Sequence, residues 1–377
     1  MKKRVLIASD TFLPKIDGVS IFLSKVIPDL AKYFKITLLV PDYKTKLKFK
    51  PIKNIEIIRT KISSLQIANY NIPLPKRKII KNLVKNSDVV WIQSIGPIGH
   101  STLKYAKKFN KKTIAYVHTI EEKRFPRVTE TTSRLRLFFR GIVRVYEQNF
   151  YNQCDRLMVA SKSISDILDN EGITTKKIIV PMGLDTKYFK PINENIKLRL
   201  RKKFGIKKDT FVIGYVGRIS KEKHLETLRD AFNKFPLENK LLLIVGGGSY
   251  FQKRIFKNTK DIKITNFVKD VVSYLRVMDV YVLPSFTETT SISTLEAMST
   301  GLPVVATPVG SVKNYIINGY NGMFFEIGDK KTLTKILLKL YENKELRTKL
   351  GKNARKTVSK FSWKITINKI KKGFNSN

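Results

Sequence analysis

The stretch RVLIASDTFLPKIDG, residues 4–18, opens the chain with a short apolar run that gives way to a polar segment containing proline and glycine. A short apolar run bounded by turn residues is typical of a buried strand, and the periodic segment 21–34 that follows is typical of a helix. The order strand, loop, helix predicts a parallel sheet flanked by helices. In such sheets ligands bind at the carboxyl ends of the strands.

The same alternation recurs along the chain. Further strands are predicted at 36–40, 88–92, 113–117 and 156–160 in the first half, and at 211–216, 240–245, 280–284 and 303–306 in the second. The segment 181–191 contains two prolines and a glycine without clear periodicity, so it separates the two series. The tail from Thr332 onward is predicted to be helical, and its last basic helix opens at Phe361 and Trp363 and ends near Phe374. The fold class is α/β with two domains.

Length and composition agree with a folded protein that has more than one core. The 377 residues exceed the roughly 250 to 300 that one core usually supports. Hydrophobic residues make up 42% and aromatic residues 10%, which suffices to bury two cores. The one cysteine, Cys154, excludes a disulfide framework and a cysteine-based zinc cluster, and it favours a reducing compartment.

No membrane-spanning segment or signal peptide is predicted. The basic start 1–4 is followed by an apolar run that Asp10 soon interrupts, which is too short for a signal peptide. No stretch reaches the roughly 18 to 20 uninterrupted apolar residues of a spanning helix. We therefore expect a cytoplasmic protein whose contact with a membrane, if it has one, is peripheral.

The formal net charge of +43 is spread evenly over both halves of the chain. A strongly basic surface attracts phosphate-rich partners, either nucleic acid or anionic lipid headgroups. An even distribution of positive charge is equally typical of proteins from a lysine-rich proteome, in which all solvent-exposed surfaces are basic. Charge alone leaves the two interpretations open.

The most specific pattern is the segment 287–298, Thr-Glu-Thr-Thr-Ser-Ile-Ser-Thr-Leu-Glu-Ala-Met, directly after the predicted strand 280–284. Its spacing puts Glu288 in the loop at the carboxyl end of a strand and Glu296 about two turns into a helix. The helix N-terminus between them suits a diphosphate, and the carboxylates suit sugar and ribose hydroxyls. The alternative is a solvated helix start with glutamates in its first turns.

A second pattern follows the predicted strand 211–216, where the segment 217–224 carries Arg218 and Lys223. Arginine can bind phosphate oxygens through two parallel hydrogen bonds and lysine adds a compact charge, so the pair could neutralise a leaving diphosphate. In a chain with 73 lysines and arginines, such a pair also arises by chance.

The two patterns occur in one order with the turn 243–248 and the segment 301–306, and in this combination the chain resembles the family-4 retaining glycosyltransferases. The resemblance extends from Ser9–Pro14 and Asp17–Val19 to Phe361–Trp363. The Thr-Glu-Thr form of the motif is similar to that of membrane-associated glycolipid glycosyltransferases, such as glycosyl-diacylglycerol synthases and phosphatidylinositol mannosyltransferases. The resemblance implies the GT-B fold and a hexosyltransferase. Its domains would be an acceptor-binding domain at 1–185, a nucleotide-sugar donor domain at 186–360, and a helix at 361–377 that returns to the first domain.

The resemblance also assigns roles to individual residues. It implies that Arg218 and Lys223 bind the donor diphosphate and that Glu288 contacts the transferred sugar. Glu296 would accept hydrogen bonds from the ribose, and His118 would lie beside the reacting sugar; His118, Glu288 and Arg218 are the implied catalytic residues. The remaining implied positions are Gly18, Thr289, Thr290 and Ser291 at the donor, and Phe267 and Val268 in the nucleobase region.

The chain departs from the family pattern at two positions. Many relatives have a glycine in place of Ser291 and another near Asn266, in the region that holds the nucleobase, so uridine and guanosine both remain open. Retaining members are thought to react on one face of the sugar, with the leaving phosphate helping to deprotonate the acceptor. The family implies no protein nucleophile, and no Asp-x-Asp metal motif occurs, so we expect neither a metal nor another cofactor.

The acceptor is expected to bind the first domain, where three arginines follow at four-residue steps: Arg136, Arg140 and Arg144. A basic amphipathic helix of this kind can lie on an anionic membrane, with arginines in the headgroups and aromatic residues at the boundary. The basic and apolar stretch 75–85 also favours contact with a membrane surface. A core helix with a solvated basic edge is the alternative. We hypothesise a lipid acceptor, such as diacylglycerol or a phospholipid headgroup, at the membrane surface.

Three other functions compete with this hypothesis. A Rossmann dehydrogenase is disfavoured because no G-x-G-x-x-G follows the first strand. A nucleic-acid-binding protein would explain the charge but not Glu288, Glu296 and the two-domain rhythm, so no nucleic-acid partner is predicted. A glycosyltransferase that acts on a polysaccharide remains the main rival. Nothing in the sequence indicates the oligomeric state.

Overall fold

The computed structural model describes residues 2–15, 17–43, 53–67, 70–118, 133–359 and 361–376. The chain divides into two compact units. Unit 1 comprises Met1–Gly183 together with Trp363–Asn377, and unit 2 comprises Leu184–Ser362. The changes of unit therefore fall at 183/184 and 362/363, beside the positions 185/186 and 360/361 expected from the sequence.

Unit 1 is built on a parallel sheet that has seven strands among the described residues, in the order β3-β2-β1-β6-β7-β8-β9. Its strands are β1 (Arg4–Ala8), β2 (Lys35–Pro41), β3 (Ile55–Thr60), β6 (Val89–Ile92), β7 (Lys112–Val117), β8 (Arg156–Val159) and β9 (Lys177–Ile179). A separate antiparallel pair joins β4 (Ile62–Ile67) to β5 (Tyr70–Pro73). The helices are α1 (Gly18–Leu30), α2 (Arg77–Lys85), α3 (Pro97–Lys108), α5 (Ser133–Tyr151), α6 (Lys162–Asn170) and α15 (Trp363–Asn375).

Helix α15 completes the core of unit 1 although it comes from the end of the chain. The ring of Phe374 is fully buried and lies 5.2 Å from the ring of Trp91 and 5.3 Å from that of Phe34, measured between centroids. At the other end of the helix, a Cβ built on Gly183 would lie 2.4 Å from the Trp363 ring, so only glycine allows this contact. The predicted last helix is confirmed.

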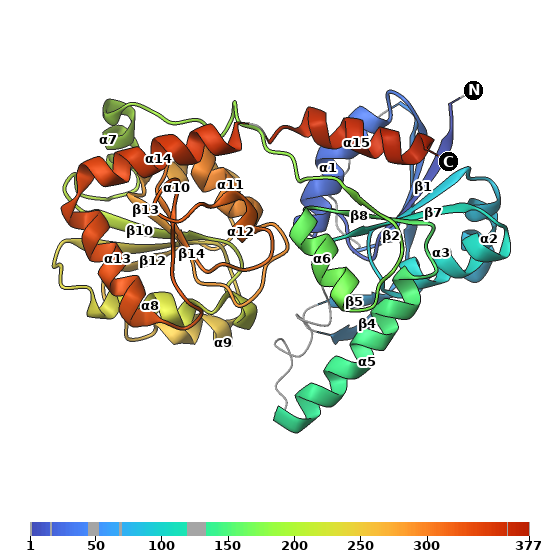
Figure 1. The fold of residues 1–377 in the computed structure, drawn as a ribbon, viewed down its shortest axis with the longest axis horizontal. Coiled ribbons are helices and arrows are strands. Elements are labelled where there is room, and N and C mark those ends of the chain that lie inside the picture. Colours follow the sequence, from blue (N-terminus) through green and yellow to red (C-terminus); the bar gives the residue numbers. More distant parts are fainter. Residues whose placement is uncertain are drawn as a thin grey trace. The chain divides into compact units, whose positions relative to one another are not determined.

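Unit 2 is built on a second parallel sheet, whose described strands follow the order β12-β11-β10-β13-β14-β15. They are β10 (Phe211–Val216), β11 (Lys240–Val245), β12 (Ile262–Ile264), β13 (Val280–Leu283), β14 (Val304–Ala306) and β15 (Met323–Phe324). The helices are α7 (Glu194–Lys203), α8 (Leu225–Lys234), α9 (Tyr250–Lys253), α10 (Val271–Val277), α11 (Ile292–Ser299), α12 (Val312–Tyr315), α13 (Lys330–Glu342) and α14 (Lys344–Val358), with 3-10 turns η1 (Lys221–Lys223) and η2 (Arg254–Phe256). Figure 1 shows helices on both faces of each sheet, as an α/β fold requires.

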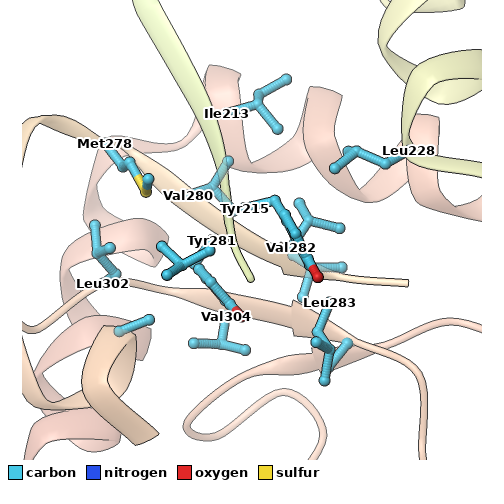
Figure 2. Packing of buried hydrophobic residues seen from close by; sticks show 14 of the residues in the cluster. Ile213, Tyr215, Leu228, Met278, Val280, Tyr281, Val282, Leu283, Leu302 and Val304 are labelled. Carbon is cyan, nitrogen blue, oxygen red and sulfur yellow. The ribbon is translucent and has the colours of Figure 1, made fainter. Parts of the chain in front are cut away.

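Two buried tyrosines connect the core of unit 2 to its functional loops. Tyr215 on β10 and Tyr281 on β13 are both fully buried, and Figure 2 shows their rings among aliphatic side chains such as Val282. The Tyr215 hydroxyl donates to the carbonyl of Arg218 at 2.9 Å, and the Tyr281 hydroxyl lies 2.9 Å from Ser293 Oγ. Burial raises the pKa of both phenols, so they stay protonated and serve as fixed anchors for these loops.

None of the helices among the described residues is long and apolar enough to cross a bilayer. Within the same residues, no group of three or more histidine, cysteine, aspartate or glutamate side chains could hold a metal ion.

Candidate active site

The loops after β10 and β11 lie backbone to backbone at the carboxyl edge of the unit 2 sheet. Gly217 and Gly246 have φ angles of +150° and +146°, and a Cβ on Gly246 would lie 1.9 Å from the Gly217 carbonyl oxygen. The Gly217 N–H donates to Val245 at 3.0 Å, and the Ile219 N–H donates to Gly247 at 2.8 Å. This glycine contact fixes the backbone from which Arg218 and Lys223 project.

Lys223 and Glu288 form an ion pair at this edge. Lys223 Nζ lies 2.6 Å from Glu288 Oε1, and the two side chains are only 18% and 10% exposed. Ser285 Oγ donates to the same oxygen at 2.9 Å. The structure thus joins two residues that the sequence analysis assigned separately to the diphosphate and to the sugar. A pair this well shielded interacts more strongly than one in bulk water.

Arg218 is oriented by a carboxylate that the sequence analysis did not single out. Its guanidinium lies 3.4 Å from Oε1 of Glu222, which is 5% exposed. Burial is the largest single influence and opposes ionisation of Glu222, but the charges of Arg218 and Lys223 and local hydrogen bonds together outweigh it, so the pKa of this carboxyl lies below its usual value. Glu222 therefore stays charged. The four-residue spacing between Arg218 and Glu222 is the sequence feature from which this ion pair could have been predicted.

The segment after β13 has a helix N-terminus between Glu288 and Glu296. Helix α11 begins at Ile292, and Glu296 lies half-buried in its second turn. The loop before it is held by its backbone: the Thr289 carbonyl accepts from the Ser311 N–H at 2.9 Å, and the Thr290 carbonyl accepts from the Tyr315 hydroxyl at 2.6 Å. Thr290 and Ser291 are both buried.

The two departures from the family pattern fall where the backbone is left-handed. Ser291 has a φ of +56° and Asn266 a φ of +59°, a region that glycine enters without steric cost. Asparagine tolerates this conformation better than serine, because its side chain can bond locally. Ser291 and Asn266 therefore hold a conformation that glycine would adopt without strain.

We expect Ser291→Gly to be more stable than Ser291→Ala by about 1 kcal/mol. Both variants lose the 2.7 Å contact between Ser291 Oγ and Thr294 Oγ1, but only glycine relieves the left-handed strain. Urea unfolding of the two variants measures the difference. Equal stabilities would contradict the conformation described for residue 291.

The predicted nucleobase region lies beside these loops. Phe267 is 61% exposed, and its ring covers the Gly247 backbone so closely that a Cβ there would lie 2.8 Å from it. Val268 packs partly against the core of unit 2. Residue 266 forms an isolated antiparallel bridge with Gly246, which ties this loop to the glycine contact.

Unit 1 presents its own predicted residues at the carboxyl edge of its sheet. Gly18 is the first residue of α1, which Asp17 caps through a reciprocal pair of 2.9 Å hydrogen bonds with Ser20. A Cβ on Gly18 would meet no heavy atom of the described residues within 4 Å. The helix start is therefore open in the described part of this unit.

His118 directly follows β7 and is packed between aromatic rings. Its ring centroid lies 4.4 Å from that of Tyr116 and 5.1 Å from that of Phe22, and its Nε2 lies 2.9 Å from Gln93 Oε1. Burial lowers the pKa of the imidazole to about 3. His118 is therefore neutral near pH 7, where it can exchange hydrogen bonds but carries no charge.

The three arginines predicted to contact a membrane lie on α5. Arg144 Nε is 3.0 Å from Glu171 Oε2, so this arginine is ion-paired within unit 1. The side chains of Arg136 and Arg140 lie outside the described residues. Tyr146 on the same helix donates to the Ile95 carbonyl at 2.7 Å and fastens α5 to the unit.

Each unit thus contains a subset of the predicted residues. The unit 2 group comprises Arg218, Lys223, Glu288, Thr289, Thr290, Ser291 and Glu296, and the unit 1 group comprises Gly18 and His118. In unit 2, two cations, a helix N-terminus and two carboxylates suit a ligand that is both anionic and rich in hydroxyls.

Comparisons with known proteins agree with this chemistry. Residues 16–188 match the model of glycosyltransferase family 4, and residues 197–357 match that of the glycosyl transferases group 1. The chain is 28% identical over 247 residues to D-inositol 3-phosphate glycosyltransferase of Corynebacterium jeikeium, which covers 61% of this chain and 59% of that protein. It is 26% identical over 370 residues to alpha-monoglucosyldiacylglycerol synthase of Acholeplasma laidlawii, which covers 93% and 91%.

Solved structures share the fold. The HepE protein of Anabaena, crystallised with UDP-glucose, superposes with a TM-score of 0.81 at 17% identity and covers 99% of this chain and all of that one. The expected pair of parallel-sheet domains is therefore confirmed as the GT-B fold. The chain belongs to the GT-B glycosyltransferases, with a family 4 N-terminal half and a group 1 C-terminal half.

Proposed function

We propose that the chain transfers a hexose, with retention of configuration, from a nucleoside diphosphate sugar of the UDP-glucose or GDP-mannose type to a membrane lipid. The acceptor is diacylglycerol or a phospholipid headgroup. The observation that carries the donor half of this proposal is the shielded Lys223–Glu288 pair, 2.6 Å apart, beside Arg218 and the start of α11.

In this proposal the donor diphosphate lies against Arg218, Lys223 and the N-terminal amides of α11. As the sugar–phosphate bond breaks, negative charge grows on the leaving phosphate, and these groups stabilise it in a water-poor site. The two cations and the helix end replace a divalent metal, so no metal or other cofactor is required.

Two carboxylates orient the hydroxyl-bearing parts of the donor. Glu288, paired with Lys223, accepts hydrogen bonds from the transferred sugar, and Glu296 accepts from the ribose. Phe267 and Val268 contact the nucleobase. The leaving phosphate takes the proton of the acceptor hydroxyl, so the reaction needs no protein nucleophile.

The lipid acceptor is supported by the relatives and by α5. The A. laidlawii relative is named for a glycosyl-diacylglycerol product and matches this chain over 93% of its length. Figure 1 shows the N-terminal part of α5 extending beyond the sheet of unit 1, and Ile142 and Val145 on this helix are 50% and 55% exposed. Exposed aliphatic side chains with arginines suit an anionic membrane surface, and we place the enzyme peripherally on its cytoplasmic face.

The test is donor hydrolysis and transfer with a panel of UDP- and GDP-sugars, with and without anionic liposomes that carry diacylglycerol or phosphatidylinositol. Radiolabel entering the lipid phase with one donor supports both halves of the proposal. If the donor is turned over but no lipid is glycosylated, the lipid acceptor is overturned in favour of a soluble or lipid-linked polysaccharide. Failure to turn over any donor overturns the donor proposal.

Membrane contact is tested separately by sedimentation with the same liposomes. We expect Ile142→Ser/Val145→Ser to sediment less than the parent chain, and raised salt to weaken sedimentation, since salt screens the attraction to headgroups. Tyr33→Ser, a change at another exposed apolar side chain of unit 1, serves as the control. Sedimentation unaffected by the α5 changes would contradict a membrane role for this helix.

A further inference from the structure

Gln93 is a buried polar side chain beside His118 that no assigned role uses. It directly follows β6, and β6 pairs with β7, which His118 follows. The side chain of Gln93 is 2% exposed, and its Oε1 lies 2.9 Å from His118 Nε2. Its amide nitrogen Nε2 finds no hydrogen-bond partner among the described residues.

The hydrogen bond determines which nitrogen of His118 carries the proton. An amide oxygen has no hydrogen and can only accept, so a bond between Gln93 Oε1 and His118 Nε2 requires the proton on Nε2. The neutral imidazole then has its unprotonated nitrogen at Nδ1.

The side-chain N–H groups of Gln93 are available to donate to a ligand. A buried N–H without a partner loses its hydrogen bonds to water and costs free energy, which native structures rarely leave uncompensated. The site lies at the carboxyl edge of a parallel sheet, where such folds bind substrates. A hydroxyl oxygen of a bound substrate would satisfy this donor.

We propose that Gln93 is a positioning residue that holds His118 in the Nε2-protonated form and donates its own N–H to a substrate hydroxyl. The second part rests on the proposed function, whereas the first part concerns the protein alone. The hydroxyl belongs either to the transferred sugar or to the acceptor, and a comparison of donor hydrolysis with sugar transfer distinguishes the two.

The first test is a ¹⁵N–¹H NMR spectrum of the full chain with labelled histidine. The chain has three histidines, so single replacements of His100, His118 and His224 by glutamine assign every signal. We expect a protonated Nε2 and an unprotonated Nδ1 at His118. Gln93→Met, which keeps the side-chain length, should give a mixture of both forms, and Gln93→Glu should restore the parent pattern because a carboxylate oxygen accepts the same bond.

This experiment needs no substrate, so its outcome is independent of the proposed function. A proton on Nδ1 in the parent chain, or a Gln93→Met spectrum identical to that of the parent, overturns the positioning role. Gln153→Met, at an exposed glutamine of the same unit, is the matched control and should leave the His118 signals unchanged. Thermal unfolding shows whether each variant is folded.

The second test is kinetic and uses UDP-glucose and GDP-mannose. We expect Gln93→Met to lower kcat/KM about tenfold, the loss of roughly one hydrogen bond to substrate. Donor hydrolysis that falls together with transfer assigns the hydroxyl to the sugar, and a fall in transfer alone assigns it to the acceptor. Unchanged kcat/KM in a folded variant overturns the substrate contact, and without turnover of either donor the NMR comparison alone decides the proposal.

Discussion

We expect Glu288→Gln to lower kcat/KM for sugar transfer by about a hundredfold to a thousandfold while the chain remains folded. Glutamine keeps the shape of the side chain but removes its charge, so the 2.6 Å pair with Lys223 becomes a neutral hydrogen bond. The sugar then loses a charged acceptor, and Lys223 loses the carboxylate that pairs with it at 2.6 Å. Both changes act on the same bound donor.

Donor hydrolysis and transfer by the purified variant measure the effect, and Glu342→Gln, at an exposed glutamate of the same unit, is the matched control. Lys223→Met/Glu288→Gln separates stability from catalysis. It removes the unpaired buried charge and should recover part of any lost stability without recovering activity. Turnover close to that of the parent in Glu288→Gln would remove Glu288 from the donor site.

The largest loss of stability is expected for Gly310→Ala, about 3 kcal/mol or more. Gly310 has a φ of +54°, and a Cβ there would lie 1.7 Å from the carbonyl oxygen of Glu288. The alanine has to push away the backbone that carries Glu288, and the bond from the Ser311 N–H to the Thr289 carbonyl opens with it. Activity should therefore fall together with the free energy of unfolding.

Gly319→Ala is the matched control for this substitution. Its φ of +77° is also left-handed, but a Cβ there would meet no heavy atom of the described residues within 4 Å. It should cost about 1 kcal/mol, the conformational penalty alone, and leave transfer intact. Chemical denaturation compares the two variants. Equal losses of stability would contradict the close contact between Gly310 and the Glu288 loop.

The sequence predicts the central strands well and the edge strands poorly. β1 and β10 are buried on both faces, so each reads as an apolar run. β3 is half-exposed, and β12 has only three residues, one of them an exposed lysine. A strand of this kind exists because a partner strand pairs with it, and an apolar run does not reveal that.

The residues of the candidate site also differ in how far the sequence predicts them. Arg218, Glu288 and His118 could be placed at strand ends because each directly or closely follows an apolar run. The pair between Lys223 and Glu288 joins residues 65 positions apart and depends on the path of two loops, which spacing does not encode. Gln93 could have been noticed, since it follows its strand as His118 follows the neighbouring one.

The assignment of α15 to unit 1 has a consequence for the order of folding. A ribosome delivers residues 184–362 before Trp363 and Phe374, so unit 2 has its complete sequence while unit 1 still lacks a helix. Until then Trp91 and Phe34 lack the ring of Phe374 that packs on them, so the nascent chain exposes aromatic surface that is prone to aggregation. Unit 1 therefore completes its core only after unit 2 has been synthesised, when α15 packs onto it.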